Sequence, residues 1–218
     1  MIRVVSWDVD GTLFSYSRLL IALFRLSPRK LQASGWIGMA GQIRDLCRFH
    51  QNVESQRRCK DSRVENADLR SFDAIEAEER VALEAALRIT EPRLSALHTL
   101  KAFRTSGVPQ VALSDFESAY KLKALGLTGY FAQTYSCRAL RYWKPSPLPF
   151  ERIERDFGVR PDEHLHIGDR NDADGWGCAR NGCHFVNVRS LRKPTNRGFL
   201  PAGNVQSYLC ETYRQAGL

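Results

Sequence analysis

The sequence lacks any hydrophobic run long enough to cross a membrane. The apolar run from Leu19 to Phe24 is far shorter than the roughly 20 residues that a spanning helix needs, so we expect it to form a buried helix. Asp8 and Asp10 interrupt the amino-terminal segment before the apolar region of a signal peptide could form. We therefore expect a cytoplasmic protein with no membrane partner.

Cysteine pairs with the Cys-x-x-Cys spacing of many zinc sites are also missing. The six cysteines are expected to be reduced thiols. Cys178 and Cys183, the latter followed by His184, suggest a zinc site, but without the paired spacing we prefer core packing for them. His164 and His166 would share one face of a strand, and we expect a structural role for both.

A recognised nucleic-acid-binding motif is absent, although the chain carries a formal charge of +8. Net charge alone is a weak indicator of a nucleic-acid partner. A solvated basic surface, or attraction of an anionic substrate, explains the same excess of lysine and arginine. We expect a small phosphorylated molecule as the partner and do not expect nucleic acid.

The chain does contain enough apolar residues for a full core. Its 218 residues, 43% of them hydrophobic, suit one domain with a modest insertion. From residue 92 onward, short apolar strands alternate with helices as far as a last strand at His184 to Val188, which predicts a parallel α/β sheet. Between Leu13 and Thr90 strand signals vanish. Apolar positions there recur at helical spacing, as in Ala74 to Leu87, so we predict an α-helical insertion.

Two carboxylates follow the first apolar run, in the segment Asp-Val-Asp-Gly-Thr. Residues 2–7 are typical of a buried strand, and Gly11 supplies the backbone freedom needed where a strand breaks into a loop. If the backbone stays extended, Asp8 and Asp10 point to the same side. Crowding two negative charges is unfavourable unless a cation shares the site, so the segment also predicts a bound metal, with oxygen ligands that favour Mg²⁺.

Three more polar residues lie at the end of a predicted strand or just before a predicted helix. Ser114 ends the apolar run Gln110–Ser114, and a helical pattern follows it. Lys144 comes after the strand candidate Gln133–Ser136 and precedes a proline-rich helix start. Asp169 follows another apolar run that ends in glycine. Because ligands in open parallel sheets bind at the carboxyl ends of the strands, these placements support one common site.

The order of these motifs resembles the haloacid dehalogenase (HAD) superfamily, in which Asp-x-Asp-Gly-Thr is followed by a serine or threonine, a lysine, and Gly-Asp with a second acid. The likeness spans residues 1–14 and about 92–190, with no matching motif between them. It implies a Rossmann-like core formed by residues 1–14 and 92–218. It also implies an α-helical cap formed by residues 15–91, which would select the substrate. The cap residues that we consider for contact with an anion are Tyr16, Arg18, Arg44 and His50.

Two positions depart from the commonest pattern of the superfamily. Trp7 stands where a smaller aromatic residue is frequent, and Ala173 stands where asparagine often precedes the final acid. The second departure leaves Asp172 and Asp174 as competing candidates for that acid. We favour Asp174, because the residues after it continue like the helix that follows in the superfamily. Its expected role is to orient the lysine of the site or a metal-bound water.

The resemblance assigns the nucleophile to Asp8 and the general acid and base to Asp10, with Lys144 as a further catalytic residue. An alkoxide leaves poorly unless it is protonated, whereas a halide needs no proton, so an acid at position 10 favours a phosphate ester over an organohalide. Magnesium would be held by the Asp8 carboxylate, the Asp10 backbone carbonyl and the Asp169 carboxylate, with Asp174 also in the metal set.

The residues expected to bind the substrate are Thr12, Ser114, Asp115 and Lys144. Ser114 and Lys144 would hold oxygens of the transferring phosphoryl group, and Lys144 would help to keep Asp8 ionised. The sequence therefore predicts a magnesium-dependent phosphatase that hydrolyses a small phosphomonoester through an aspartyl-phosphate. A phosphomutase with the same core residues and a non-catalytic member that binds through its basic surface are the alternatives.

Overall fold

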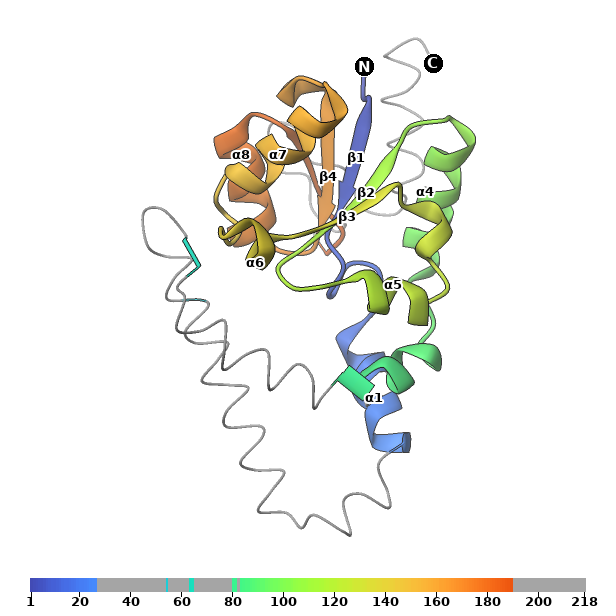
Figure 1. The fold of residues 1–218 in the computed structure, drawn as a ribbon. Coiled ribbons are helices and arrows are strands. Elements are labelled where there is room, and N and C mark those ends of the chain that lie inside the picture. The colour runs from blue at the N-terminus through green and yellow to red at the C-terminus, as the bar shows by residue number, and fades with distance from the viewer. Residues whose placement is uncertain (27–53, 55–62, 65–79, 82, 190–218) are drawn as a thin grey trace.

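The computed structural model describes residues 1–26, 54, 63–64, 80–81 and 83–189 (Figure 1). Much of the predicted cap, residues 15–91, and the carboxyl-terminal segment from residue 190 therefore lie outside the described residues. Of the helix predicted over residues 74–87, residues 74–79 and 82 are not described, while residues 80–81 and 83–88 are helical.

The core of the protein is a five-stranded sheet with the order β3-β2-β1-β4-β5, and every neighbouring pair of strands is parallel. The strands are β1 (Val4–Trp7), β2 (Gln110–Ser114), β3 (Gln133–Ser136), β4 (His164–Gly168) and β5 (His184–Asn187). The parallel α/β fold predicted from the alternation of strands and helices is confirmed. Each strand also lies within one or two residues of the run that predicted it.

Helices lie between the successive strands of the chain. They are α1 (Tyr16–Leu26), α4 (Leu94–Thr105), α5 (Ala119–Ala124), α6 (Cys137–Leu140), α7 (Leu148–Phe157) and α8 (Trp176–Asn181). Short turns of other helical types lie at Thr128–Tyr130, Pro161–Glu163 and Asn171–Gly175. As the proline-rich sequence predicted, a proline, Pro149, lies in the first turn of α7, where its missing N–H costs no helical hydrogen bond.

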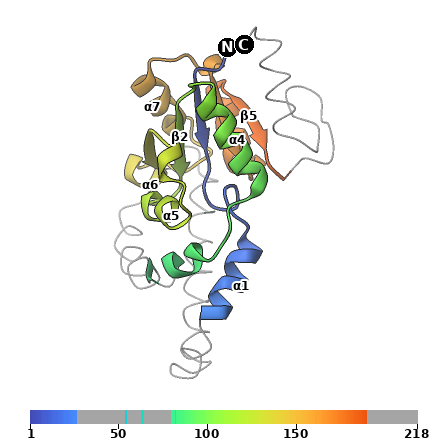
Figure 2. The same ribbon diagram turned by 90° about the vertical axis from the view of Figure 1, so that its right-hand side faces the viewer.

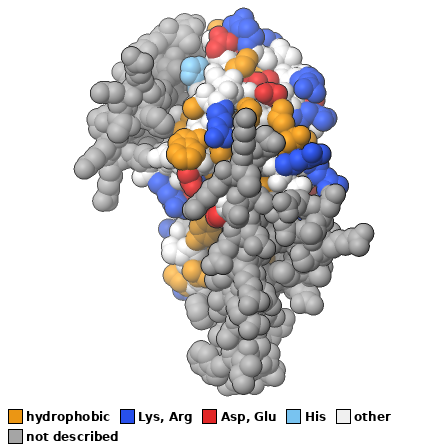
Figure 3. Space-filling model, turned by 90° about the vertical axis from the view of Figure 1, so that its left-hand side faces the viewer, with side chains coloured by type: hydrophobic (Ala, Val, Ile, Leu, Met, Phe, Trp, Pro, Cys, Tyr) orange, Lys and Arg blue, Asp and Glu red, His pale blue; other side chains and the backbone are white. Residues whose placement is uncertain are grey.

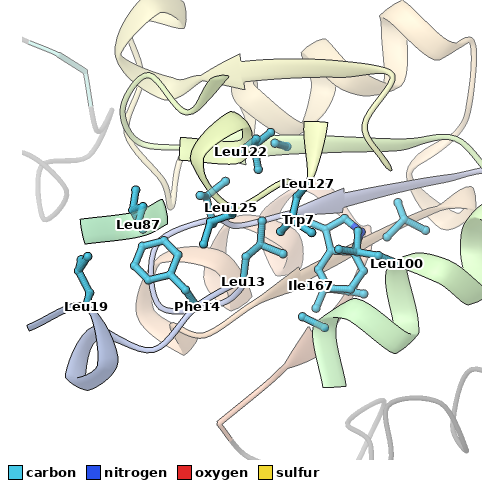
Figure 4. Close-up of a cluster of buried hydrophobic side chains, with 14 of the residues drawn as sticks. Trp7, Leu13, Phe14, Leu19, Leu87, Leu100, Leu122, Leu125, Leu127 and Ile167 are labelled. Carbon is cyan, nitrogen blue, oxygen red and sulfur yellow. The ribbon is translucent and has the colours of Figure 1, made fainter. Parts of the chain in front are cut away.

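One face of the sheet packs against α4 and α5. Val5 and Trp7 of β1 belong to the same buried cluster as Leu100 of α4 and Leu122 of α5. Figure 4 shows Trp7 and Leu100 close together in this cluster. The Trp7 indole N–H donates a hydrogen bond to the buried side chain of Gln110 over 3.1 Å, which satisfies the polar atom of this large residue.

The other face of the sheet packs against α7 and α8. Val4 of β1 shares a second buried cluster with Phe150 of α7 and Cys178 of α8. Ser6 lies two residues after Val4 in the same strand, so its side chain points to this face as well. This side of the sheet therefore contains polar groups among the apolar residues of its core.

Helix α1 and the helical residues 83–88 lie side by side beyond the carboxyl ends of the strands (Figures 1 and 2). Leu19 of α1 and Leu87 pack into the same cluster as Phe14. The helix expected around Leu19 is present, but it is buried on one side only, because Leu20 and Ile21 are about half exposed. No helix among the described residues is long and apolar enough to cross a membrane.

The basic residues do not form one patch on the face shown in Figure 3. In that view, lysine and arginine side chains occupy several separate places among acidic, hydrophobic and uncharged ones. Such a distribution is typical of a solvated basic surface.

We expect Leu100→Ala to lower the free energy of unfolding by about 2–5 kcal/mol, because it would leave a cavity between α4 and the sheet. Leu94→Ala is the matched control, since Leu94 lies in the same helix and is 66% exposed. Its effect should stay within about 0.5 kcal/mol. Urea unfolding of the two variants measures both values, and equal destabilisation would contradict this description of the core.

Candidate active site

The predicted site residues meet at the carboxyl edge of the sheet. Asp8 directly follows β1, Ser114 is the last residue of β2, and Asp169 directly follows β4. Gly11 turns the chain there with a φ of 87°. A Cβ atom at Gly11 would collide with the Asp169 carboxylate, so only glycine lets this loop pass so close to the end of β4.

Lys144 joins two of these carboxylates. Its Nζ donates hydrogen bonds to Asp8 Oδ1 over 2.7 Å and to Asp174 Oδ1 over 2.6 Å, and its side chain is 2% exposed. Burial alone would lower the pKa of Lys144, but the charges of Asp174 and Asp8 raise it well above its usual value. Lys144 is therefore a permanently charged group between two acids.

Asp8 has a partner at each carboxylate oxygen. Oδ1 accepts the Lys144 hydrogen bond, and Oδ2 accepts a hydrogen bond from Thr12 Oγ1 over 2.9 Å. Burial raises the pKa of Asp8 to about 8 against the opposing effect of Lys144, and the charges of Asp174 and Asp169 raise it further. A bound cation would favour the ionised carboxylate that attack requires. Thr12, predicted to bind substrate, thus contacts Asp8 directly.

The structure separates the two candidates for the second acid. Asp174 is buried, and it contacts Lys144 through Oδ1 and the backbone N–H of Arg170 through Oδ2. Although burial acts to raise the pKa of Asp174, Lys144 and the hydrogen bond with His166 lower it strongly. Asp172 instead forms an exposed ion pair with the Arg170 guanidinium. Asp174 therefore lies beside Lys144, where the second acid was expected, and Asp172 does not.

Asp10 has a cationic partner that the motifs did not predict. Lys121 of α5 donates to both Asp10 carboxylate oxygens over 2.8 and 2.7 Å, and Ser114 Oγ donates to Oδ2 over 3.2 Å. Lys121 belongs to no motif. The sequence predicts only that it lies in a helix after Ser114. Asp115 is half-buried next to Ser114, and its backbone carbonyl accepts a hydrogen bond from the N–H of Arg138.

A cavity of about 590 Å³ opens beside Asp169. It is lined by Tyr16, Asp169, Arg170, Asn171, Asp172, Asn187 and Arg189. Of the cap residues considered for anion contact, Tyr16 lines this cavity and Arg18 pairs with Glu91, while Arg44 and His50 lie outside the described residues. Its wall contains two arginines, and each is paired with an aspartate of the same wall, Arg170 with Asp172 and Arg189 with Asp169.

The acidic residues of the site fit a magnesium ion. Carboxylate oxygens of Asp8, Asp169 and Asp174 lie within 4.8 Å of one another. Such all-oxygen ligands are those that Mg²⁺ prefers. Burial raises the pKa of Asp169 against the effect of Arg189. Asp169 Oδ2 forms an ion pair with Arg189 but receives no hydrogen bond of good geometry, so this buried oxygen is suited to accept a metal ion.

Comparisons with known proteins agree with this geometry. The sequence model of one family, described as haloacid dehalogenase-like hydrolase, matches residues 2–182. The chain is 27% identical over 198 residues to a glyceraldehyde 3-phosphate phosphatase from Methanopyrus kandleri, and the match covers 87% of this chain and 84% of the relative.

Solved structures share the fold. A HAD phosphatase from Thermococcus onnurineus matches with a TM-score of 0.61 and 22% identity, over 99% of this chain and 98% of that one. A 2-haloacid dehalogenase from Pseudomonas syringae pv. Tomato DC3000 matches with a TM-score of 0.63 and 20% identity, over 99% and 100% of the two chains. Because both identities are low, these matches establish the fold and not the reaction.

The raised pKa of Asp8 predicts a pH-dependent effect of Asp8→Asn on stability in the absence of divalent metal. The folded protein holds a proton on Asp8 up to about pH 8, whereas the unfolded chain loses it near pH 4, so native stability falls as the pH rises between these values. The amide side chain of the variant does not titrate. We therefore expect the difference in Tm, variant minus native protein, to become more positive from pH 5 to pH 8 in the presence of a chelator.

The matched control for this measurement is Asp172→Asn, which removes a carboxylate whose side chain is 53% exposed. Thermal unfolding followed by circular dichroism gives the Tm values. A difference between Asp8→Asn and the native protein that does not change with pH would contradict the electrostatic description of the site.

Proposed function

The chain belongs to the haloacid dehalogenase-like hydrolases, and we propose that it is a magnesium-dependent phosphatase that cleaves a small phosphomonoester through an aspartyl-phosphate on Asp8. The relative from Methanopyrus kandleri, which is named as a phosphatase, supports this reaction. Dehalogenases share the fold, so the choice between the two reactions depends on the residues of the site.

The observation that carries the proposal is the position of the Asp10 carboxylate. Lys121 and Ser114 hold it at the carboxyl edge of the sheet, two residues after Asp8. A phosphate ester releases an alkoxide, which needs a proton, and a carboxyl group at this position can supply it. The same group can then take a proton from the water that hydrolyses the aspartyl-phosphate. A halide leaving group would not need the first of these steps.

Lys144 and Thr12 prepare Asp8 for attack. Each holds one oxygen of the Asp8 carboxylate, which limits its rotation and aims it into the site. The Lys144 ammonium also offsets part of the charge of the incoming phosphate. Asp174 fixes Lys144 in this position through its 2.6 Å hydrogen bond. We assign Asp174 to this orienting role in preference to direct metal contact. Its two oxygens already have three hydrogen-bond partners, Lys144, His166 and the Arg170 N–H, whereas each oxygen of Asp8 has one.

Magnesium would be held by the carboxylates of Asp8 and Asp169 together with the backbone carbonyl of Asp10. When bound, it would reduce the repulsion between the phosphate dianion and the nucleophile. The ion pair between Asp169 and Arg189 would then have to open, which would free the Arg189 guanidinium to face the cavity.

The substrate would occupy the cavity beside Asp169, whose volume of about 590 Å³ suits a small molecule. Residues 15–91 would form the cap that selects it, with Tyr16 at the boundary between the cap and the core. Glyceraldehyde 3-phosphate is the first compound to test, because the relative is named for it.

Phosphate release from a panel of phosphomonoesters, with and without Mg²⁺, tests the proposal. We expect release only with the metal, loss of turnover in Asp8→Asn, and a decrease of about 100- to 10,000-fold in Asp10→Asn. Asp162→Asn is the control, because Asp162 pairs with Arg160 at the surface. Undiminished turnover in Asp8→Asn would exclude the aspartyl-phosphate.

A second comparison tests the assignment of the last acid. Asp174→Asn should lower kcat by about 10- to 100-fold, because Lys144 would lose one of its two anionic partners and its fixed position. Asp172→Asn should change kcat less than about twofold, since Asp172 pairs with Arg170 in the cavity wall and not with Lys144, so that any effect should fall on KM. Steady-state kinetics on the best substrate gives both values, and the opposite order would reverse the assignment.

A further inference from the structure

A second group of metal-binding side chains lies away from the acidic site. Glu154 of α7, His164 at the start of β4 and Cys183 just before β5 bring one ligand atom each to within 4.8 Å of the others. Glu154 and His164 are buried, and Cys183 is half-buried. The group lies at the amino ends of β4 and β5, so it occupies the edge of the sheet opposite the candidate active site.

A chain of buried hydrogen bonds connects this group to the active site. It runs through Glu154, His164, Ser6, His166 and Asp174. His164 Nδ1 lies 2.9 Å from Glu154 Oε1, and Ser6 Oγ lies 2.7 Å from a ring nitrogen of each histidine. His166 Nε2 lies 3.2 Å from Asp174 Oδ1, the oxygen that also accepts from Lys144.

A count of protons shows that this chain of hydrogen bonds lacks one proton. Each of its four contacts needs one proton, so four are needed. Two neutral imidazoles supply one N–H each and Ser6 supplies one O–H, which makes three when both carboxylates are ionised. His166 is fully buried, where a positive charge is unfavourable, so its neutral form is favoured.

The tautomers locate the shortage. Asp174 is ionised, so His166 donates its Nε2–H to it and accepts from Ser6 at Nδ1. Ser6 must then accept the Nε2–H of His164. This assignment leaves His164 Nδ1 without a proton, facing the Glu154 carboxylate over 2.9 Å. With both imidazoles neutral, a lone pair of His164 Nδ1 thus faces a lone pair of Glu154 Oε1 at the place where Cys183 approaches. Either a second proton on the His164 ring or a metal ion can fill the position between them.

We propose that Glu154, His164 and Cys183 bind a zinc ion at this position. Mixed oxygen, nitrogen and sulfur ligands are typical of zinc sites. A Zn²⁺ ion would displace the thiol proton of Cys183 and supply the positive charge that the contact between His164 and Glu154 lacks. The charges of the Glu154 carboxylate and the Cys183 thiolate would then balance the charge of the ion. The contact between His164 and Glu154 would open slightly, since ligands of tetrahedral zinc lie roughly 3.3–3.6 Å apart.

Neighbouring groups support the ligands. With Nδ1 on the metal, His164 donates its other ring N–H to Ser6, the kind of contact that orients metal-binding histidines. Asn181 donates a hydrogen bond to Glu154 Oε1 over 2.5 Å. Burial raises the pKa of the nearby Cys178 thiol well above its usual value, so Cys178 stays a neutral thiol. Half-buried Cys183 leaves room for water as a fourth ligand.

The proposed ligands differ from those of the zinc alternative that the sequence analysis set aside in favour of core packing. That alternative combined Cys178 and Cys183 with His184. In the structure, the His184 ring is exposed and contacts the backbone carbonyl of Asp162. His164, which precedes Cys183 by 19 positions, takes its place because β4 and β5 are neighbours in the sheet.

Cobalt binding tests the proposal without depending on the phosphatase activity. Co²⁺ in a site with a cysteine ligand gives a thiolate-to-metal absorption band that an all-oxygen site cannot give. We expect one equivalent of Co²⁺ to produce this band in the metal-free protein and Zn²⁺ to displace it. Asp8→Asn should retain the band, which separates this site from the acidic one.

Cys183→Ala should lose the band and weaken Co²⁺ binding by more than about tenfold. Cys137→Ala, which removes a buried cysteine outside the group, should retain both. Glu154→Gln keeps the thiol and should also weaken binding, so the proposal can be tested even if Cys183→Ala does not fold. Absence of the band in the native protein, or an equal band in Cys183→Ala, would show that a proton and not a metal ion occupies the group.

Discussion

The candidate active site at the carboxyl edge of the sheet depends on the buried ammonium group of Lys144 between Asp8 and Asp174. None of these three ionisable groups could carry a charge there alone, because an unpaired charge loses its hydration on burial. Together they hold the loop after β1, the segment before α7 and the turn after β4 at one point. The contact therefore organises the site and also restrains the connections of three different elements, which explains why a structural and a chemical role coincide in one lysine.

The two faces of the sheet serve different purposes. The face toward α4 and α5 is mainly apolar, with Gln110 as the polar partner of Trp7, and supplies the stability expected of buried hydrophobic surface. The face toward α7 and α8 contains Ser6, His164 and His166 among its apolar residues. Burying these polar groups costs free energy unless each has a partner, and the chain of hydrogen bonds provides those partners. The polar groups on the second face thus lower its contribution to stability, and their hydrogen bonds connect the amino and carboxyl edges of the sheet.

The strands and the meeting of Asp8, Ser114, Lys144 and Asp169 were predictable, since each follows from a short apolar run or a helix start in a parallel fold. Local patterns could not identify Lys121 as the partner of Asp10, because the two are 111 positions apart and only the packing of α5 brings them together. The same holds for the group around His164. The sequence indicated that His164 and His166 share a face, but their partner Ser6 comes from the neighbouring strand.

The position of Ser6 has a consequence for how this sequence can change during evolution. Its hydroxyl group lies between two imidazoles, as donor to one and acceptor from the other. A methyl group at that point would leave one ring nitrogen of each histidine without a partner, while replacement of either ring would remove one of the two hydrogen bonds of the hydroxyl. A substitution at one of positions 6, 164 and 166 is therefore unfavourable unless the other two change as well. Among close relatives they should be found either all polar or all apolar, as a unit inherited together.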